Sequence, residues 1–286
     1  MKLMTKTIII FVALVGLMLI VFRNELFVAP PATEGAPAVS AAFERLAKLP
    51  SEVNESSGLA ILAAGHYLTH NDAGNRPYLY ELDASGKLLQ TIKLKLPNVD
   101  WEDLAQDDDG NVYIADTGNN ENDRTELAVY KVNPDEPENV QAIRFTYEDQ
   151  TKYPPKKKDR NFDSEALFWS EGNLYVISKD RGRGETAKVY QLPDQAGTHK
   201  AKLIGQHKLK AQVTGATISP DQSTVVLLSE GALHLFTDFD SPAKFYEGVY
   251  ERQSLKEAGQ TEGVAFESED VLIITSEGGN LYRYTL

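Results

Sequence analysis

The sequence predicts an all-β protein: a β-propeller of four-stranded blades, preceded by an N-terminal transmembrane helix. Three observations carry this prediction. A short motif recurs five times, runs typical of β-strands follow each copy, and a single long apolar run lies at the N-terminus. Four-stranded units that recur about every 45 residues are typical of propeller blades.

Residues 1–28 have the pattern of a membrane anchor. Lys2 and Lys6 precede an apolar run over residues 8–22, and the flanking residues bring it near the ~20 residues that a span needs. A cleaved signal peptide has a similar pattern. Because flanking lysines stay in the cytoplasm, both interpretations place the remainder outside it, either tethered by a single pass or secreted after cleavage.

Residues 29–40 are rich in Pro and Ala, which indicates a linker. The folded domain is therefore expected over residues 41–286. Within it, five segments open with a polar residue and continue through small or apolar ones. They begin at Ser57, Glu102, Glu165, Thr214 and Glu262, at spacings of 45, 63, 49 and 48 residues. The long second spacing indicates an insertion around residues 153–160.

Five motifs predict five blades, with six as the alternative if one blade lacks a recognisable motif. Turn sequences and three further β-rich runs follow most motifs, but the last unit has only three strands before Leu286. We expect residues 41–50 to supply its fourth strand. This closure would cover a sheet edge that an open ring exposes.

An acid stands at the end of the second expected strand of every unit, 14 to 16 residues after the opening polar residue. These acids are Asp72, Asp116, Asp180, Glu230 and Glu277. In an antiparallel meander, the start of the first strand and the end of the second lie at the same edge. The five acids should therefore share one rim with Glu102, Glu165 and Glu262, where their charges repel unless a cation or basic ligand lies among them.

This rim is a candidate metal site. Carboxylate ligands in a chain without cysteine favour Ca²⁺, with Mg²⁺ as the alternative, over zinc. The expected metal ligands are Glu102, Glu165, Glu262, Asp116 and Asp72. Ordinary turn chemistry, in which an Asp side chain holds its own loop, remains an alternative for each acid that ends a second strand.

Polar residues beside the rim are candidates for binding a small molecule or peptide. They are His70, Asn119, Asn120, Arg124, Lys179, Asp180, Glu230 and Glu277. The net charge of −13 argues against a nucleic-acid partner, and membrane contact is expected through the N-terminal helix only. We expect a monomer. The absence of cysteine excludes disulfides and thiol nucleophiles.

Several segments resemble bacterial β-propellers of the SdiA-regulated family, with looser similarity to esterase-like phytase and NHL-type propellers. The most specific are WEDLA at residues 101–105 and DTGNN at 116–120. The resemblance covers roughly residues 41–286. It implies a propeller in the periplasm with a calcium site near its channel, in which Glu102, Asp116 and Glu165 match the family's motifs, and it implies no established reaction. Thr214 departs from the pattern, which puts a complete ring of ligands in doubt.

Three functions stay open at this point. The first is a periplasmic domain, tethered to the bacterial inner membrane, that binds a divalent cation and a small ligand or peptide at the acidic mouth, which is the end of the channel that carries the rim of acids. The second is a metal-dependent hydrolase of phosphoesters or esters, with Glu102, Glu165 or Glu262 as ligand or general base. The third is a protein-interaction propeller without a metal.

Overall fold

Tight turns between short apolar runs determine where the strands lie. At the first hairpin of the second repeat, the carboxylate of Asp107 accepts hydrogen bonds from the backbone N–H groups of Asp109 (3.1 Å) and Asn111 (2.8 Å). Gly110 has a φ of 78° in this turn, a left-handed conformation that glycine adopts without steric cost. The apolar residues on either side are buried, so the turn sequence and the burial pattern together define the hairpin.

The computed structural model describes residues 42–255 and 258–286. The predicted transmembrane helix at residues 1–28 and the linker at 29–40 lie outside these ranges. No helix within the described ranges is long and apolar enough to span a membrane.

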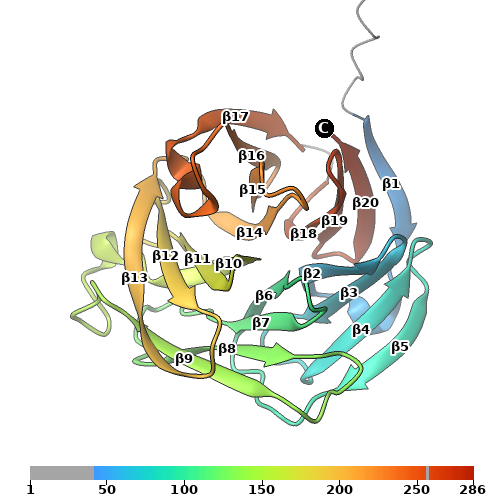
Figure 1. Cartoon of the computed structure of the whole chain (residues 1–286), viewed down its shortest axis with the longest axis horizontal. Helices are drawn as coiled ribbons and strands as arrows, with labels where there is room; N and C mark the ends of the chain where they lie inside the picture. Colours follow the sequence, from blue (N-terminus) through green and yellow to red (C-terminus); the bar gives the residue numbers. More distant parts are fainter. Residues whose placement is uncertain (1–41, 256–257) are drawn as a thin grey trace, which may run out of the picture. The chain divides into compact units, whose positions relative to one another are not determined.

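In the described residues, the strands form five successive antiparallel sets of four (Figure 1). The first set comprises β2 (Ser56–Ala63), β3 (His66–Asn71), β4 (Tyr78–Asp83) and β5 (Leu88–Lys93). The second comprises β6 (Trp101–Gln106), β7 (Val112–Asp116), β8 (Leu127–Val132) and β9 (Gln141–Tyr147). The third comprises β10 (Asp163–Ser170), β11 (Asn173–Lys179), β12 (Ala187–Pro193) and β13 (Gly197–His207).

The fourth set comprises β14 (Val213–Ile218), β15 (Val225–Ser229), β16 (Ala232–Thr237) and β17 (Val249–Ser254). The fifth comprises β18 (Thr261–Ser268), β19 (Val271–Ser276), β20 (Asn280–Thr285) and β1 (Ala42–Lys48). In the part of the chain that the structure describes, three short 3₁₀ helices lie between strands: η1 (Ser51–Val53), η2 (Lys157–Asp159) and η3 (Pro242–Glu247).

The last set is completed by the N-terminal end of the domain. Strand β1 pairs antiparallel with β20, from Ala42 opposite Thr285 to Lys48 opposite Asn280. The ring of Phe43 stacks on Tyr282 at 4.9 Å between ring centroids. The prediction that residues 41–50 supply this strand is confirmed.

The second and third sets share one eight-stranded sheet. Residues 197–201 of β13 pair in parallel with residues 143–147 of β9. The sequence analysis did not anticipate this pairing. It joins two outermost strands, so one outer edge of each set is covered by the other.

The sets pack face to face around a centre. Five apolar clusters each combine residues of neighbouring sets, and one of them joins Leu59 and Tyr67 of the first set to Ile273 and Leu281 of the last. The first strands β2, β6, β10, β14 and β18 contact one another in a closed circle. The prediction of an all-β propeller fold is confirmed.

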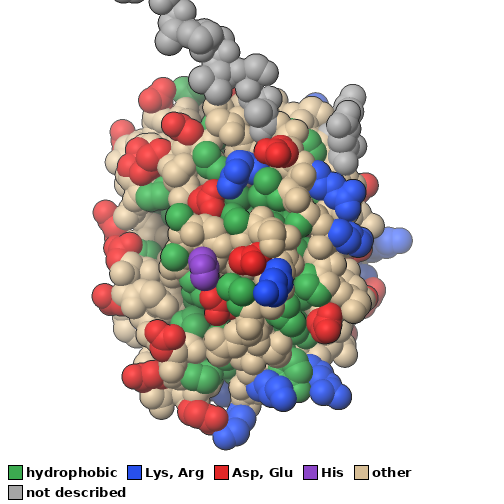
Figure 2. Space-filling model, turned by 90° about the vertical axis from the view of Figure 1, so that its right-hand side faces the viewer, with side chains coloured by type: hydrophobic (Ala, Val, Ile, Leu, Met, Phe, Trp, Pro, Cys, Tyr) green, Lys and Arg blue, Asp and Glu red, His purple; other side chains and the backbone are tan. Residues whose placement is uncertain are grey.

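The outer surface carries charge of both signs. Figure 2 shows acidic side chains gathered mostly along one edge of the view, and basic side chains mostly along the other and at the bottom. Charges of opposite sign are therefore unevenly distributed over this side of the molecule.

Candidate metal centre

Each first strand is irregular at its opening polar residue. The pairing register of β6 with β7 shifts between Trp101 and Leu104, and that of β10 with β11 shifts between Ser164 and Ala166. Strands β2, β14 and β18 have a shift at the same point of the repeat. A bulge takes a residue out of the regular ladder and re-aims its side chain. The fold therefore repeats one local distortion at the position of Glu102 and its counterparts.

Two groups of carboxylates meet beside these bulges. One contains Asp72, Asp100 and Glu102, and the other contains Glu102, Asp163 and Glu165. In each group, one oxygen per residue lies within 4.8 Å of the others. Glu102 belongs to both groups and is therefore the central acid of the site.

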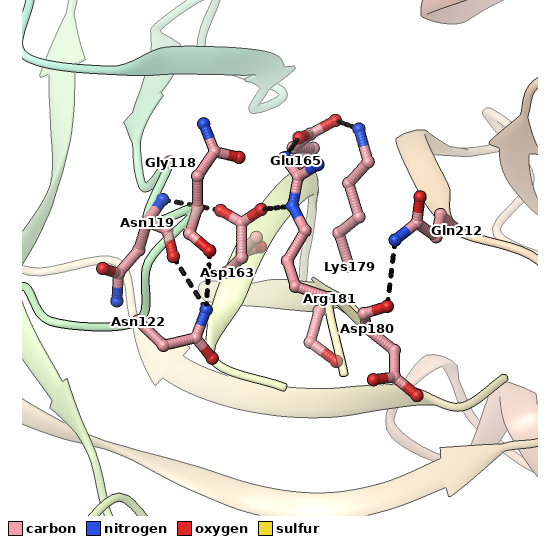
Figure 3. A network of polar contacts seen from close by, with 12 residues as sticks. Gly118, Asn119, Asn122, Asp163, Glu165, Lys179, Asp180, Arg181 and Gln212 are labelled. Carbon is pink, nitrogen blue, oxygen red and sulfur yellow. Dashed lines mark hydrogen bonds and ion pairs between the residues drawn. The ribbon is translucent and has the colours of Figure 1, made fainter. Parts of the chain in front are cut away.

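Basic side chains pair with two acids of the second group, Asp163 and Glu165 (Figure 3). The guanidinium of Arg181 contacts both Asp163 and Glu165, and the ammonium of Lys179 contacts Glu165. Asp163 also accepts a hydrogen bond of 2.6 Å from the backbone N–H of Asn119. Burial raises the pKa of Glu165 to about 7, although Lys179 and Arg181 act in the opposite direction.

The first group has no such partners. Within residues 42–255 and 258–286, no hydrogen bond or ion pair reaches the carboxylates of Asp100 and Glu102. The carboxylate of Asp72 accepts one bond of 2.6 Å, from the backbone N–H of Ala73. Glu102 is only 6 % exposed and has no donor among these residues, but its carboxylate oxygens are not among the fully buried polar atoms that lack a partner, so they still reach solvent.

The pKa shifts follow from this arrangement. Burial, followed by the charges of Glu165 and Asp163, raises the pKa of Glu102 well above its ordinary value. Burial and the neighbouring Asp72 raise the pKa of Asp100 to about 6. These carboxylates therefore bind protons more readily than isolated ones, which is the expected response to uncompensated negative charge.

Gly118 allows the backbone to approach this group. A Cβ atom at this position would lie 2.1 Å from Oε1 of Glu102 and 2.3 Å from Oδ2 of Asp100. The loop after β7 is held in place by Asn119, whose side chain donates to the carbonyl of Phe162 at 3.1 Å. The DTGNN segment thus forms one wall of the acidic site.

Glu262 stands next to these groups but outside both of them. It is partly buried, and burial together with the charge of Glu165 raises its pKa to about 8. Glu277 is also partly buried and contributes to the same shift. Glu230 is exposed, and in its unit Thr214 donates instead to the backbone carbonyl of Thr261 at 2.8 Å.

The carboxylates of two predicted site residues are bound by backbone amides of loops. The carboxylate of Asp116 accepts hydrogen bonds from the N–H groups of Val99 and Asp100 and pairs with Arg124 at 2.8 Å. Asp180 accepts four backbone N–H bonds of 3.0 to 3.2 Å from its own loop. Against the effect of burial, these amides lower the pKa of Asp180. For Asp180 the structure shows the turn chemistry that the sequence left as an alternative, whereas Asp116 holds the loop that precedes β6.

The remaining candidates lie around the site without entering the two groups. His70 is fully buried edge-on against Trp101, with 5.5 Å between ring centroids. Its Nε2 has no hydrogen-bond partner in the described chain, and burial lowers its pKa to about 4. Asn120 is exposed beside the buried Asn119.

Asp100, Asp163 and Arg181 are the site residues that the sequence analysis did not select. Asp100 and Asp163 each stand two residues before a glutamate that was selected, and alternate residues share one side of a strand. That spacing was the available signal. Nothing in the local sequence distinguishes Arg181 from its solvated neighbour Arg183.

The comparison with known families agrees with this architecture. The profile of the SdiA-regulated family matches residues 50–285. This chain belongs to the SdiA-regulated family. No curated protein matches this family member in sequence.

Solved structures resemble this SdiA-regulated protein in fold. The PQQ-bound aldose sugar dehydrogenase of Streptomyces coelicolor has a TM-score of 0.52 at 11 % identity, over 87 % of this chain and 99 % of its own. A protein of unknown function from Bacteroides thetaiotaomicron has a TM-score of 0.51 at 10 % identity, over 86 % and 76 %. A candidate gluconolactonase has a TM-score of 0.50 at 13 % identity, over 86 % and 92 %. At these identities the likeness shows the fold alone.

Proposed function

We propose that this protein is a membrane-tethered, extracytoplasmic propeller of five blades that binds a divalent cation and a small ligand or peptide at its acidic mouth. One observation carries the proposal. Glu102 is 6 % exposed, lies among acids and has no hydrogen-bond donor within the described residues. A carboxylate that is largely removed from water and has no donor is destabilised, and a bound cation reduces that cost.

The chemistry of the donors fits a hard cation. Asp72, Asp100 and Glu102 offer carboxylate oxygens, the ligands that Ca²⁺ and Mg²⁺ prefer. The neighbouring acids Asp163 and Glu165 already pair with basic side chains. We therefore assign the cation to the first group, with Ca²⁺ as the first choice and Mg²⁺ as the alternative.

The same mouth offers positive charge for a ligand. Lys179 and Arg181 lie beside the proposed cation, since they contact Glu165 in the second group of acids. An anionic ligand could contact them while one of its oxygens completes the coordination of the cation. A ligand without an acidic group would leave this half of the mouth unused.

Calcium should stabilise the folded protein, because a cation that binds only the folded state raises stability by mass action. The measurement is thermal unfolding in Ca²⁺, in Mg²⁺ and in chelator. We expect Glu102→Gln to lose the response, since the amide keeps the shape and removes the charge. Glu230→Gln, an exposed acid at the same edge, and Asp109→Asn, in a hairpin turn at the opposite edge, should keep it. Equal melting temperatures in calcium and chelator would leave the metal-free, protein-interaction function instead.

One observation favours a hydrolase as the second candidate. The pKa of Glu262 is raised to about 8, and a general base or acid works best with a pKa near the working pH. One structural neighbour is a candidate gluconolactonase, so lactones belong in the substrate panel with phosphoesters and carboxylic esters. Activity that needs calcium and disappears in Glu262→Gln, while the calcium response remains, would establish the hydrolase.

A further inference from the structure

One residue beyond the acidic mouth, the five first strands carry a second set of equivalent positions. Four of these positions hold glycine or alanine and one holds an acid. They are Gly58, Asp103, Ala166, Gly215 and Gly263.

Small residues are needed there because the first strands approach one another closely. A Cβ atom on Gly58 would lie 2.5 Å from the backbone nitrogen of Leu104, and one on Gly215 would lie 2.4 Å from the carbonyl oxygen of Glu262. A Cβ atom on Gly263 would lie 2.6 Å from the carbonyl oxygen of Ser57. Of these five equivalent positions, where the first strands lie close together, Asp103 alone carries a polar side chain.

The side chain of Asp103 links three first strands. It is fully buried. Its Oδ1 accepts the N–H of Leu104 in β6 at 2.8 Å, and its Oδ2 accepts the N–H groups of Leu167 in β10 at 2.8 Å and of Ala216 in β14 at 3.1 Å. Backbone N–H groups that converge in this way form an anion site, and the site is filled here by an acid of the same chain. Burial raises the pKa of Asp103 well above its ordinary value, while the three amides act in the opposite direction.

A cavity begins on the far side of this carboxylate. It has a volume of about 330 Å³, and its lining starts with Leu59, Leu104, Leu167 and Ala216 and continues toward the opposite ends of the same strands. Glu102 of the acidic mouth precedes Asp103 directly. The carboxylate therefore lies between the mouth and the cavity.

We infer that Asp103 is an internal carboxyl group, bound by the backbone amides of three strand sets, that closes the central channel between the acidic mouth and the cavity. The mouth is consequently blind, so its ligands enter and leave through the acidic face alone. The inference stands on these three contacts and is independent of whether a cation binds at Glu102.

The test replaces the internal carboxyl group with an external one. Asp103→Gly introduces the residue that three other units already carry, and it removes the carboxylate. In full-length protein, we expect this variant to melt several degrees below the parent and formate to restore most of the loss. Formate should leave the parent unchanged because the site is already filled. Benzoate, which is too large for this position, should not rescue the variant.

Hydrogen exchange locates the effect. The amides of Leu167 and Ala216 should exchange slowly in the parent, faster in Asp103→Gly and slowly again with formate. Asp109→Gly, in an exposed turn, is the control and should respond to neither. If Asp103→Gly does not fold, Asp103→Asn replaces it. This variant keeps the volume but turns one acceptor into a donor, so at least one of the three amides should exchange faster, without rescue by formate. Unchanged exchange in both variants, or a formate effect on the parent or the control as large as that on Asp103→Gly, would overturn the inference.

Discussion

At Glu262, a single carboxylate gives the stability of the molecule a definite pH dependence. Its pKa is about 8 in the folded protein, against an ordinary value of 4.5. Because the raised pKa means that the folded state binds the proton more tightly, the contribution to stability is complete below pH 4.5 and is lost as the pH rises through 8. Glu165, with a pKa of about 7, acts in the same direction.

We therefore predict that in chelator the melting temperature falls as the pH rises from 6.5 to 8.5. Above about pH 7.5, His70 and His234, whose ordinary pKa is 6.5, are neutral in both the folded and the unfolded state, so the upper half of this window reports the acids. Glu262→Gln should flatten the profile. A variant profile as steep as that of the parent would show that Glu262 does not titrate in this range.

Gly118→Ala tests the wall of the acidic site. The new methyl group would lie 2.1 Å from Glu102 and 2.3 Å from Asp100, so one or both carboxylates must move. We expect a loss of about 1–3 kcal/mol in the free energy of unfolding, as for other overpacked sites, and a weakened calcium response. Asn120→Ala, at an exposed residue of the same loop, is the matched control. Chemical denaturation and calcium titration of both variants check the prediction, and equal behaviour would contradict it.

The repeat spacing alone selected the acids Asp72, Glu102 and Glu165, which the structure brings together with Asp100 and Asp163. Spacing could not show which of the acids use their oxygens to accept hydrogen bonds from backbone amides of loops. Asp180 and Asp116 occupy equivalent positions to Asp72, yet their oxygens bond backbone amides of nearby loops. That difference depends on the path of each loop, which a sequence pattern does not encode.

At the scale of single elements, β1 is the strand on which closure depends. Deleting residues 42–48 would remove every pairing partner of one edge of β20 and the stacking of Phe43 on Tyr282. We predict a much lower melting temperature and aggregation, because an exposed edge pairs with other chains. Deletion of residues 29–38 is the control. Thermal unfolding with light scattering measures both, and equal stability of the two truncations would show that β1 contributes little.

Strand positions could be read from the sequence better than pairings between sets. The missing fourth strand of the last unit predicted β1, because an incomplete sheet needs a partner. The parallel contact of β13 with β9 had no comparable signal. It depends on the length of β13 and on the course of the inserted segment, and both are set by the tertiary arrangement.

At the scale of the whole molecule, the proposed membrane tether leads to a prediction of topology from the charges at the N-terminus. Lys2 and Lys6 precede the apolar run, and lysines beside a span remain in the cytoplasm. We predict that a reporter fused after Leu286 is active if it requires export and inactive if it requires the cytoplasm. The opposite pattern would refute the extracytoplasmic location. As a second test, replacing both lysines with glutamate should reduce the fraction of protein inserted in the expected orientation, as measured with the same reporter.

The overall architecture was predictable because each repeat is one unit that buries its faces against its neighbours. Five motifs in the sequence correspond to five strand sets, and the apolar clusters between them follow from the alternation of each strand. The filling of the centre by Asp103 was not predictable. One acid among four small residues resembles an ordinary substitution until the three amides around it are seen.

The pairing of β1 with β20 also has a mechanical consequence. Ala42 lies opposite Thr285, so the start of β1 is beside the end of β20 (Figure 1). A force that pulls residues 42 and 286 apart therefore acts on the hydrogen bonds between β1 and β20 one after another. It begins at the Ala42–Thr285 end of the ladder. A ladder opened in this way yields at a lower force than one in which all the bonds are sheared together. Under such tension we expect β1 to detach from β20 first, before the inner strands that carry the acidic mouth separate.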